Sequence, residues 1–278
     1  MVIESNRWIR NGIVISVESV KLLFANPILF VYALVPLATV LIWQFLVGTP
    51  VVLPSENLDN TVTPHNTSVG LYVIFTWICF IVGTFFACCL AHHTMRILRQ
   101  QLASVRESFA WCSQHSKQIV AWILIELFLS FGWLTLFPQS TYMLLTIGAI
   151  VAALFLLGFL SFILLLFKLH IVIPIISTEQ IEIIPAIKRS SLVIWHNLGT
   201  YIVMLFSSGI ISVLLYAVPA TLIGLLVGTQ PFIHSVWNAQ LVLLLSLPIF
   251  TIANTLFYYE FYIKRDLELQ DILFTSQV

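Results

Sequence analysis

Long runs of apolar residues dominate the pattern of this chain and predict helices that cross a membrane. A helix needs about 20 predominantly apolar residues to span the hydrocarbon layer. Six runs reach this length, and they are continuous, whereas the strands of a membrane barrel alternate over about ten residues. The predicted spans cover residues 28–48, 69–91, 119–137, 142–167, 198–228 and 239–259. We therefore expect one all-α integral membrane domain, residues 1–278, built as a six-helix bundle.

The cationic residues predict the orientation of these spans. Segments 49–68, 138–141 and 229–238 contain no Lys or Arg, so the spans can be arranged with every cation on one side. Loops rich in Lys and Arg stay in the cytoplasm, which places both termini there. The twelve cations are Arg7, Arg10, Lys21, Arg96, Arg99, Arg106, Lys117, Lys168, Lys188, Arg189, Lys264 and Arg265.

The composition agrees with lipid as the main solvent. Mean hydropathy is +1.02 and only 9% of the residues are charged, against about 25% in soluble proteins. The formal net charge is zero, which gives no electrostatic reason to expect a nucleic-acid partner. Membrane lipids are the expected partners, with another membrane protein or a second copy of the chain as further alternatives.

The segments on the cytoplasmic side are predicted to be short amphipathic helices lying against the membrane. In the first segment Ile13, Val17, Val20 and Phe24 share one face at helical spacing. The opposite face is mostly polar, with Ser16, Glu18, Ser19 and Lys21. Such a helix can anchor the bundle at the interface or take part in binding lipid, and the pattern fits both.

A short pattern recurs three times and indicates an internal repeat. Each copy has a charged residue followed by serine, and an Asn or His lies eight residues after the charge, just before an odd-numbered span. The copies are spaced 89 and 82 residues apart, which suggests three parallel hairpins, each preceded by an amphipathic helix. The matching residues are Glu18, Ser19 and Asn26; Glu107, Ser108 and His115; and Arg189, Ser190 and Asn197.

One stretch of the chain resembles a known group of proteins. It contains Ile173-Pro174 and Glu179, then residues 186–190, Trp195 and Asn197; the basic stretch Arg96–Arg106 leading to Trp122 is also similar. These features resemble a bacterial family of six-helix membrane proteins of unknown function, distantly similar to the membrane domain of glycerophosphodiester phosphodiesterases. The resemblance implies a six-span architecture in the bacterial inner membrane. It implies no activity, because this chain has no room for the soluble catalytic barrel of those enzymes.

Glu126 is the main candidate for chemistry within the membrane. It lies about two residues from the midpoint of the third predicted span, where a carboxylate costs about 2.5–3.5 kcal/mol unless it finds a partner or a proton. Three explanations remain open, namely a proton or ion relay, a protonated acid hydrogen-bonded between helices, and a shifted helix that brings the acid nearer the interface. The expected polar site groups Glu126 with Ser208, Ser212 and Asn254, and Ser207 and Thr251 are further partner candidates.

The sequence contains no catalytic motif that would specify an enzyme. Phosphate-binding loops, nucleophile elbows and HExxH are absent, and adjacent His92 and His93 diverge on a helix. We therefore expect no enzymatic activity, metal or cofactor. The leading hypothesis is a non-enzymatic scaffold, assembly or lipid-handling component of the envelope. The alternative is a small-solute or ion transporter or channel that uses Glu126.

Overall fold

The computed structural model describes residues 2–47, 66–126, 171–179, 181–227 and 236–265. Within these ranges every regular element is helical, which confirms the all-α prediction. Residues 116–126 form a further helical segment. The elements are α1 (Val2–Ala25), the 3-10 turn η1 (Pro27–Phe30), α2 (Val31–Val47), α3 (Asn66–Leu98), α4 (Val105–Gln114), α7 (Val172–Glu179), α8 (Ile183–His196), α9 (Leu198–Val227), α10 (Val236–Tyr258) and the π-helical turn η3 (Tyr259–Ile263).

Two helical segments in the described part of the chain are long and apolar enough to cross a membrane. They are Trp77–Leu98 in α3 and Leu198–Leu215 in α9, at the second and fifth predicted spans. A third is possible if Arg7–Ala25 and Pro27–Thr39, which bend by 97°, form one broken span. The predicted fourth span and all of the third beyond Glu126 lie outside the described residues. These apolar helices are compatible with a membrane location.

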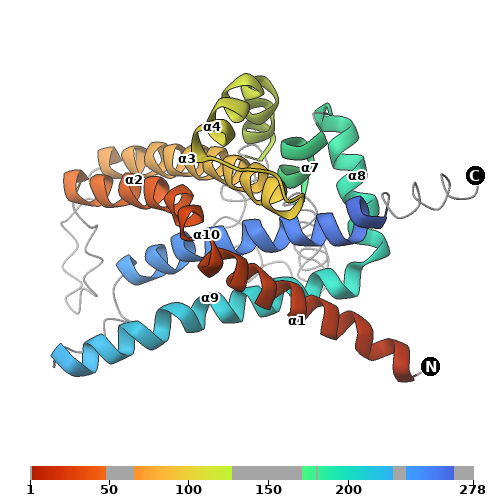
Figure 1. Cartoon of the computed structure of the whole chain (residues 1–278). Helices are drawn as coiled ribbons and strands as arrows, with labels where there is room; N and C mark the ends of the chain where they lie inside the picture. Colours follow the sequence, from red (N-terminus) through yellow and green to blue (C-terminus); the bar gives the residue numbers. More distant parts are fainter. Residues whose placement is uncertain (1, 48–65, 127–170, 180, 228–235, 266–278) are drawn as a thin grey trace, which may run out of the picture.

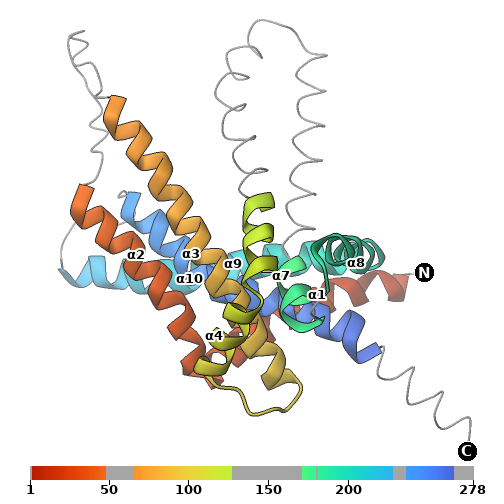
Figure 2. The same cartoon turned by 90° about the horizontal axis from the view of Figure 1, so that it is seen from above.

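Helix α10 lies at the centre of the described helices (Figure 1). It contacts α1 and α9 on one side and α2 and α3 on the other. Seen from above, α2 and α3 cross the direction of α9 obliquely (Figure 2). Helix α4 packs on α3, and α7 joins α3 to α8, so these shorter helices gather at the end of α3 that carries Arg96.

Helix α1 packs closely along α9. A Cβ atom on Gly12 would lie 2.7 Å from the carbonyl oxygen of Thr200 and 2.8 Å from Val203, so only glycine fits there. One turn later, Ser16 donates to the carbonyl of Met204 at 2.9 Å and lies 2.6 Å from Ser207 Oγ. Small residues thus allow the two backbones to approach, and hydroxyl groups join them.

Helix α1 is amphipathic as predicted, but part of its polar face is buried. Ile13, Val17 and Phe24 share an exposed face as expected, but Ser16 and Ser19 on the polar face are buried. The polar face is divided because its serines meet α9, whereas Glu18 and Lys21 stay exposed and pair with each other at 2.7 Å. An apolar face turned outward is favourable where the surrounding solvent is lipid rather than water.

The three copies of the repeated pattern share one local geometry. The helix in each copy ends at the Asn or His, which bonds the backbone carbonyl four residues earlier. Donor–acceptor distances are 3.1 Å for Asn26 to Leu22, 2.9 Å for His115 to Trp111, and 3.0 Å for Asn197 to Val193. Each of these polar residues therefore stabilises a helix end just before the next helix begins.

Burial also follows the repeat. The serines Ser19, Ser108 and Ser190 are all buried, and each donates to a carbonyl of its own helix three or four residues earlier. Four residues after the serine, a second position is buried in all three copies, and the residue after it is exposed. The buried residues are Leu23, Cys112 and Ile194, and the exposed ones are Phe24, Ser113 and Trp195. The three helices thus present equivalent faces to their surroundings.

Candidate functional site

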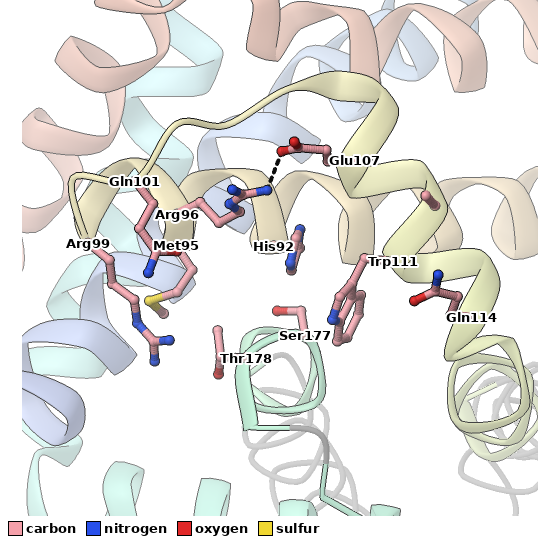
Figure 3. Close-up of a pocket in the computed structure, with 11 residues that line it drawn as sticks. His92, Met95, Arg96, Arg99, Gln101, Glu107, Trp111, Gln114, Ser177 and Thr178 are labelled. Carbon is pink, nitrogen blue, oxygen red and sulfur yellow. Dashed lines mark hydrogen bonds and ion pairs between the residues drawn. The ribbon is translucent and has the colours of Figure 1, made fainter.

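A pocket of about 400 Å³ opens between the end of α3, helix α4 and the end of α7 (Figure 3). It lies where the apolar helix Trp77–Leu98 ends, so it combines charged groups with an apolar wall. Its volume is within the range of about 300–1,000 Å³ typical of small-molecule sites. The lining residues are His92, Met95, Arg96, Arg99, Gln101, Glu107, Ala110, Trp111, Gln114, Ser177 and Thr178.

The end of α3 shapes the first wall. Gln100 has φ of 55°, a left-handed conformation that is uncommon for a residue other than glycine. Gln101 N donates to the carbonyl of Arg96, and Gln100 N donates to that of Ile97, both at 2.9 Å. These two bonds form a Schellman motif, which ends the helix and reverses the chain. Arg99 and Gln101 on either side of this turn both line the pocket.

Helix α4 begins with a side-chain cap and is tied to α3 by an ion pair. Ser104 has an extended backbone and accepts a hydrogen bond from Glu107 N at 3.2 Å, the usual geometry of an N-cap. Glu107 forms an ion pair with Arg96 of α3 across the edge of the pocket (Figure 3). Because both side chains keep contact with solvent, this pair positions α4 more than it stabilises the fold.

Stacked rings form the second wall. Trp111 of α4 lies between two imidazoles, with ring centroids 4.7 Å from His92 and 4.1 Å from His115. His92 Nδ1 also lies 3.4 Å from the hydroxyl of Ser108. The stack joins α3 to α4, and its His92 and Trp111 line the cavity (Figure 3).

The third wall is the C-terminal turn of α7. The hydroxyls of Ser177 and Thr178 donate to the carbonyl of Pro174 at 2.9 and 2.7 Å. A hydroxyl that donates inward keeps lone pairs available to accept from a ligand. Glu179 at the end of α7 forms an ion pair with Arg189 of α8 and accepts a hydrogen bond from Tyr258 of α10. These two interactions connect the end of α7 to α8 and α10.

The charged groups of the pocket leave one positive charge. Apart from the imidazole of His92, the ionisable lining residues within the described part of the chain are two arginines and one glutamate. Arg96 is neutralised by Glu107. No ion pair among the described residues involves Arg99, whose guanidinium extends toward Thr178 (Figure 3). The pocket is therefore suited to an anion.

The residues predicted to form an intramembrane polar site are connected to different partners. Glu126 is 7% exposed and accepts a hydrogen bond from Thr84 of α3 at 3.3 Å. Ser208 donates to Ser16 of α1 at 2.9 Å. Ser212 donates to the carbonyl of Ser208, and Asn254 accepts from Tyr201 at 3.1 Å. Within the described residues, no hydrogen bond joins Glu126 to the other three.

Sequence reasoning missed both Thr84 and the pocket. Thr84 is one of two threonines in an apolar run, and nothing in the sequence shows that it faces the span of Glu126. Ser207, a predicted partner of Glu126, bonds Ser16 instead. The arginines of the pocket were explained by topology alone. The adjacent polar residues Arg99, Gln100 and Gln101 at the end of a span were the available signal, since three polar side chains at one helix end can form a site.

Among the described residues, no group of three His, Cys, Asp or Glu side chains is arranged to hold a metal ion. The residues present instead suit binding of a polar anion through hydrogen bonds and charge. Comparison with family models, with curated proteins and with solved structures finds no match to this chain.

Proposed function

We propose that this chain is a non-enzymatic lipid-handling component of the bacterial inner membrane, with six spans and both termini in the cytoplasm. The observation that carries this proposal is the cationic pocket at the end of an apolar span. A site at the end of a span is accessible to the headgroup of a lipid whose acyl chains lie beside the helix. Clusters of Arg and Lys at such positions are typical of anionic lipid sites.

The distribution of charge supports the topology. Arg96 and Arg99 line the pocket, and Arg106 lies on the helix that borders it. Retention of cationic segments in the cytoplasm puts this end of α3 on the inner side. The repeated helix ends at Asn26, His115 and Asn197 support three related hairpins, each entered from that same side.

Exposed apolar faces on α1 and α8 support contact with the lipid surface. Ile13, Val17 and Phe24 are exposed on α1. On α8, Ile184, Leu192 and Trp195 are exposed at helical spacing, with the exposed Lys188 between them. Trp and Lys on an apolar face are favourable at the headgroup level, where the ring and the ammonium group reach water.

Native mass spectrometry after mild detergent extraction tests the proposal. We expect a stoichiometric phospholipid on the intact chain, removed by enlarging Ala110 to Trp in the pocket lining. The matched control is Ser113→Trp, because Ser113 is exposed on α4 but does not line the pocket. Equal lipid retention in both variants would contradict the proposal. A stoichiometric partner chain in place of lipid would favour the assembly role.

Amine labelling in intact cells tests the orientation. Lys117 and Lys188 are exposed side chains on the proposed cytoplasmic side. An impermeant amine reagent should leave both unmodified until the cells are broken. Modification of either lysine in intact cells would reject the six-span arrangement.

Transport through Glu126 is the second candidate, supported by its burial and its hydrogen bond to Thr84. A carboxyl that accepts one hydroxyl bond at a low-dielectric position is stable when protonated. We expect Glu126→Gln to fold like the parent chain and to keep the lipid. Loss of folded protein would show that an ionised, paired carboxylate is required. Proton uptake by vesicles containing the parent but not Glu126→Gln would favour transport.

A further inference from the structure

From the charge balance of the pocket, we infer that it selects phospholipids whose headgroup carries a single negative charge, with Arg99 as the residue that binds the phosphate. This inference rests on the proposed lipid-handling function and names the class of lipid.

Among the lining residues that the structure describes, Arg99 is the cation without an ion pair, whereas Arg96 is already paired. The Arg96 guanidinium is bound to Glu107, and that pair also fixes α4. Arg99 is exposed to the cavity and follows the last residue of α3, next to the reversing turn at Gln100. A planar guanidinium binds phosphate oxygens through two parallel N–H groups, so one free arginine is sufficient for one phosphate.

The carboxylate of Glu107 limits the charge that the pocket accepts. A phosphate diester carries one negative charge and balances Arg99. A phosphate monoester carries up to two, and its second charge would lie near Glu107 without a free cation to compensate it. Like charges at close range in a partly dry site are unfavourable. A zwitterionic headgroup has no net charge and would leave the single positive charge of the pocket uncompensated.

Neutral donors around the cation suit a headgroup that carries hydroxyl groups. The amides of Gln101 and Gln114 line the cavity and can both donate and accept, and the hydroxyls of Ser177 and Thr178 can accept. Trp111 and Met95 add apolar surface for the glycerol carbons. This lining fits a phosphate with a short polyol, as in phosphatidylglycerol.

A lipid source for this phosphate is favoured over a soluble one by Leu102. This side chain is 92% exposed and directly follows Gln101 of the pocket. In water, a leucine side chain this exposed contributes no free energy from burial of its apolar surface. Beside a membrane, the same side chain can insert among acyl chains. The pocket mouth and this apolar side chain together match the headgroup and the chains of one lipid.

Titration of the purified protein with short-chain lipids tests the inference, with native mass spectrometry as the readout. We expect phosphatidylglycerol to bind about tenfold more tightly than phosphatidylethanolamine or phosphatidic acid. Arg99→Gln should weaken phosphatidylglycerol binding about tenfold. Arg106→Gln removes the same charge from an exposed site outside the pocket lining and should have no effect.

Glu107→Gln gives a second, opposite test. Removal of the carboxylate frees Arg96 and raises the positive charge of the pocket, so binding of phosphatidic acid should increase about tenfold. Ser104 remains as the N-cap of α4, and circular dichroism checks that the helix persists. No gain for phosphatidic acid in the folded variant would overturn the role assigned to Glu107.

The remaining outcomes separate this inference from the proposed function. Lipid bound in the pocket with no preference for charge, or with no dependence on Arg99, would overturn the inference and leave lipid handling intact. Absence of any lipid from the pocket would overturn both. Inorganic phosphate that competes at the affinity of phosphatidylglycerol would show a soluble ligand and overturn the lipid source.

Discussion

Helices α1 and α4 carry the same repeated pattern, yet one forms a closed contact and the other borders an open site. On α1, Gly12 brings the backbone against α9 and Ser16 bonds directly across the interface. On α4, an ion pair and a ring stack hold the helix beside α3 and leave a pocket of about 400 Å³. The pattern therefore specifies how each helix ends, and the small or large residues around it decide whether space remains.

In helix α8, the charged residue of the repeated pattern has a third kind of contact. Its Arg189, which corresponds to Glu18 and Glu107 in the pattern, pairs with Glu179 and lies 4.9 Å above the ring of Tyr262. The charged position of the repeat thus has a different use in each copy. It is exposed and paired within α1, it links α4 to α3, and it links α8 to both α7 and η3.

Gly12→Ala should have the largest effect on stability, because it places a methyl group in the closely packed interface between α1 and α9. The new methyl group would meet the carbonyl of Thr200, which cannot move without displacing α9. We expect a loss of about 2–3 kcal/mol of stability, although alanine is the better helix former. Gly83→Ala is the matched control, since its Cβ would lie 3.7 Å from Leu247. Thermal unfolding in detergent measures both, and equal melting temperatures would contradict the close packing of α1.

Glu179→Gln should have the next largest effect, because it neutralises the residue that ties α7 to α8 and α10. Arg189 would lose its ionic partner in a partly buried site, at a cost of about 1–2 kcal/mol. Glu18→Gln is the control, because its pair with Lys21 is exposed and worth little. A double variant with Arg189→Gln should cost less than the sum of the two single changes. Full additivity would show that the pair is not coupled.

Ser16→Ala and Ser19→Ala compare two serines on the same helix. Ser16 bonds Met204, Ser207 and Ser208 on α9, whereas Ser19 bonds only the carbonyl of Ser16 in its own helix among the hydrogen bonds of the described residues. We expect Ser16→Ala to cost about 1 kcal/mol and Ser19→Ala almost nothing. Melting temperatures that fall equally would show that burial, and not the bond across the interface, is what matters.

Gln100→Gly should have the smallest effect and the opposite sign. Glycine adopts the left-handed conformation of this turn without the penalty of a side chain, so stability should rise by up to about 1 kcal/mol. Gln101→Gly is the control at the neighbouring position, where φ is not positive, and it should not stabilise the chain. Lipid affinity should stay unchanged in Gln100→Gly, because Gln100 does not line the pocket. A loss of stability would contradict the Schellman geometry.

Local pattern was enough to predict much of the fold. The apolar runs predicted α3 and α9 as candidate spans. The repeat placed Asn26, His115 and Asn197 just before the odd-numbered spans, and the structure shows that a helix ends at each of them. The sequence placed Ser16 and Ser19 on the polar face of α1 but did not show that they are buried against α9, because hydropathy cannot distinguish a polar face in water from one that is hydrogen-bonded to another helix. Segments 127–170 and the full six-span arrangement remain predictions.

Helix ends and spans can be deduced from the chain because hydrophobic periodicity, charge and capping act between residues a few positions apart. Contacts such as Ser208 to Ser16, separated by 192 positions, depend on how helices pack, and no local signal contains that information. The same holds for Thr84 as the partner of Glu126 and for the pocket between α3, α4 and α7. A cavity exists only where three surfaces fail to fill the space between them, so tertiary packing alone could create this one.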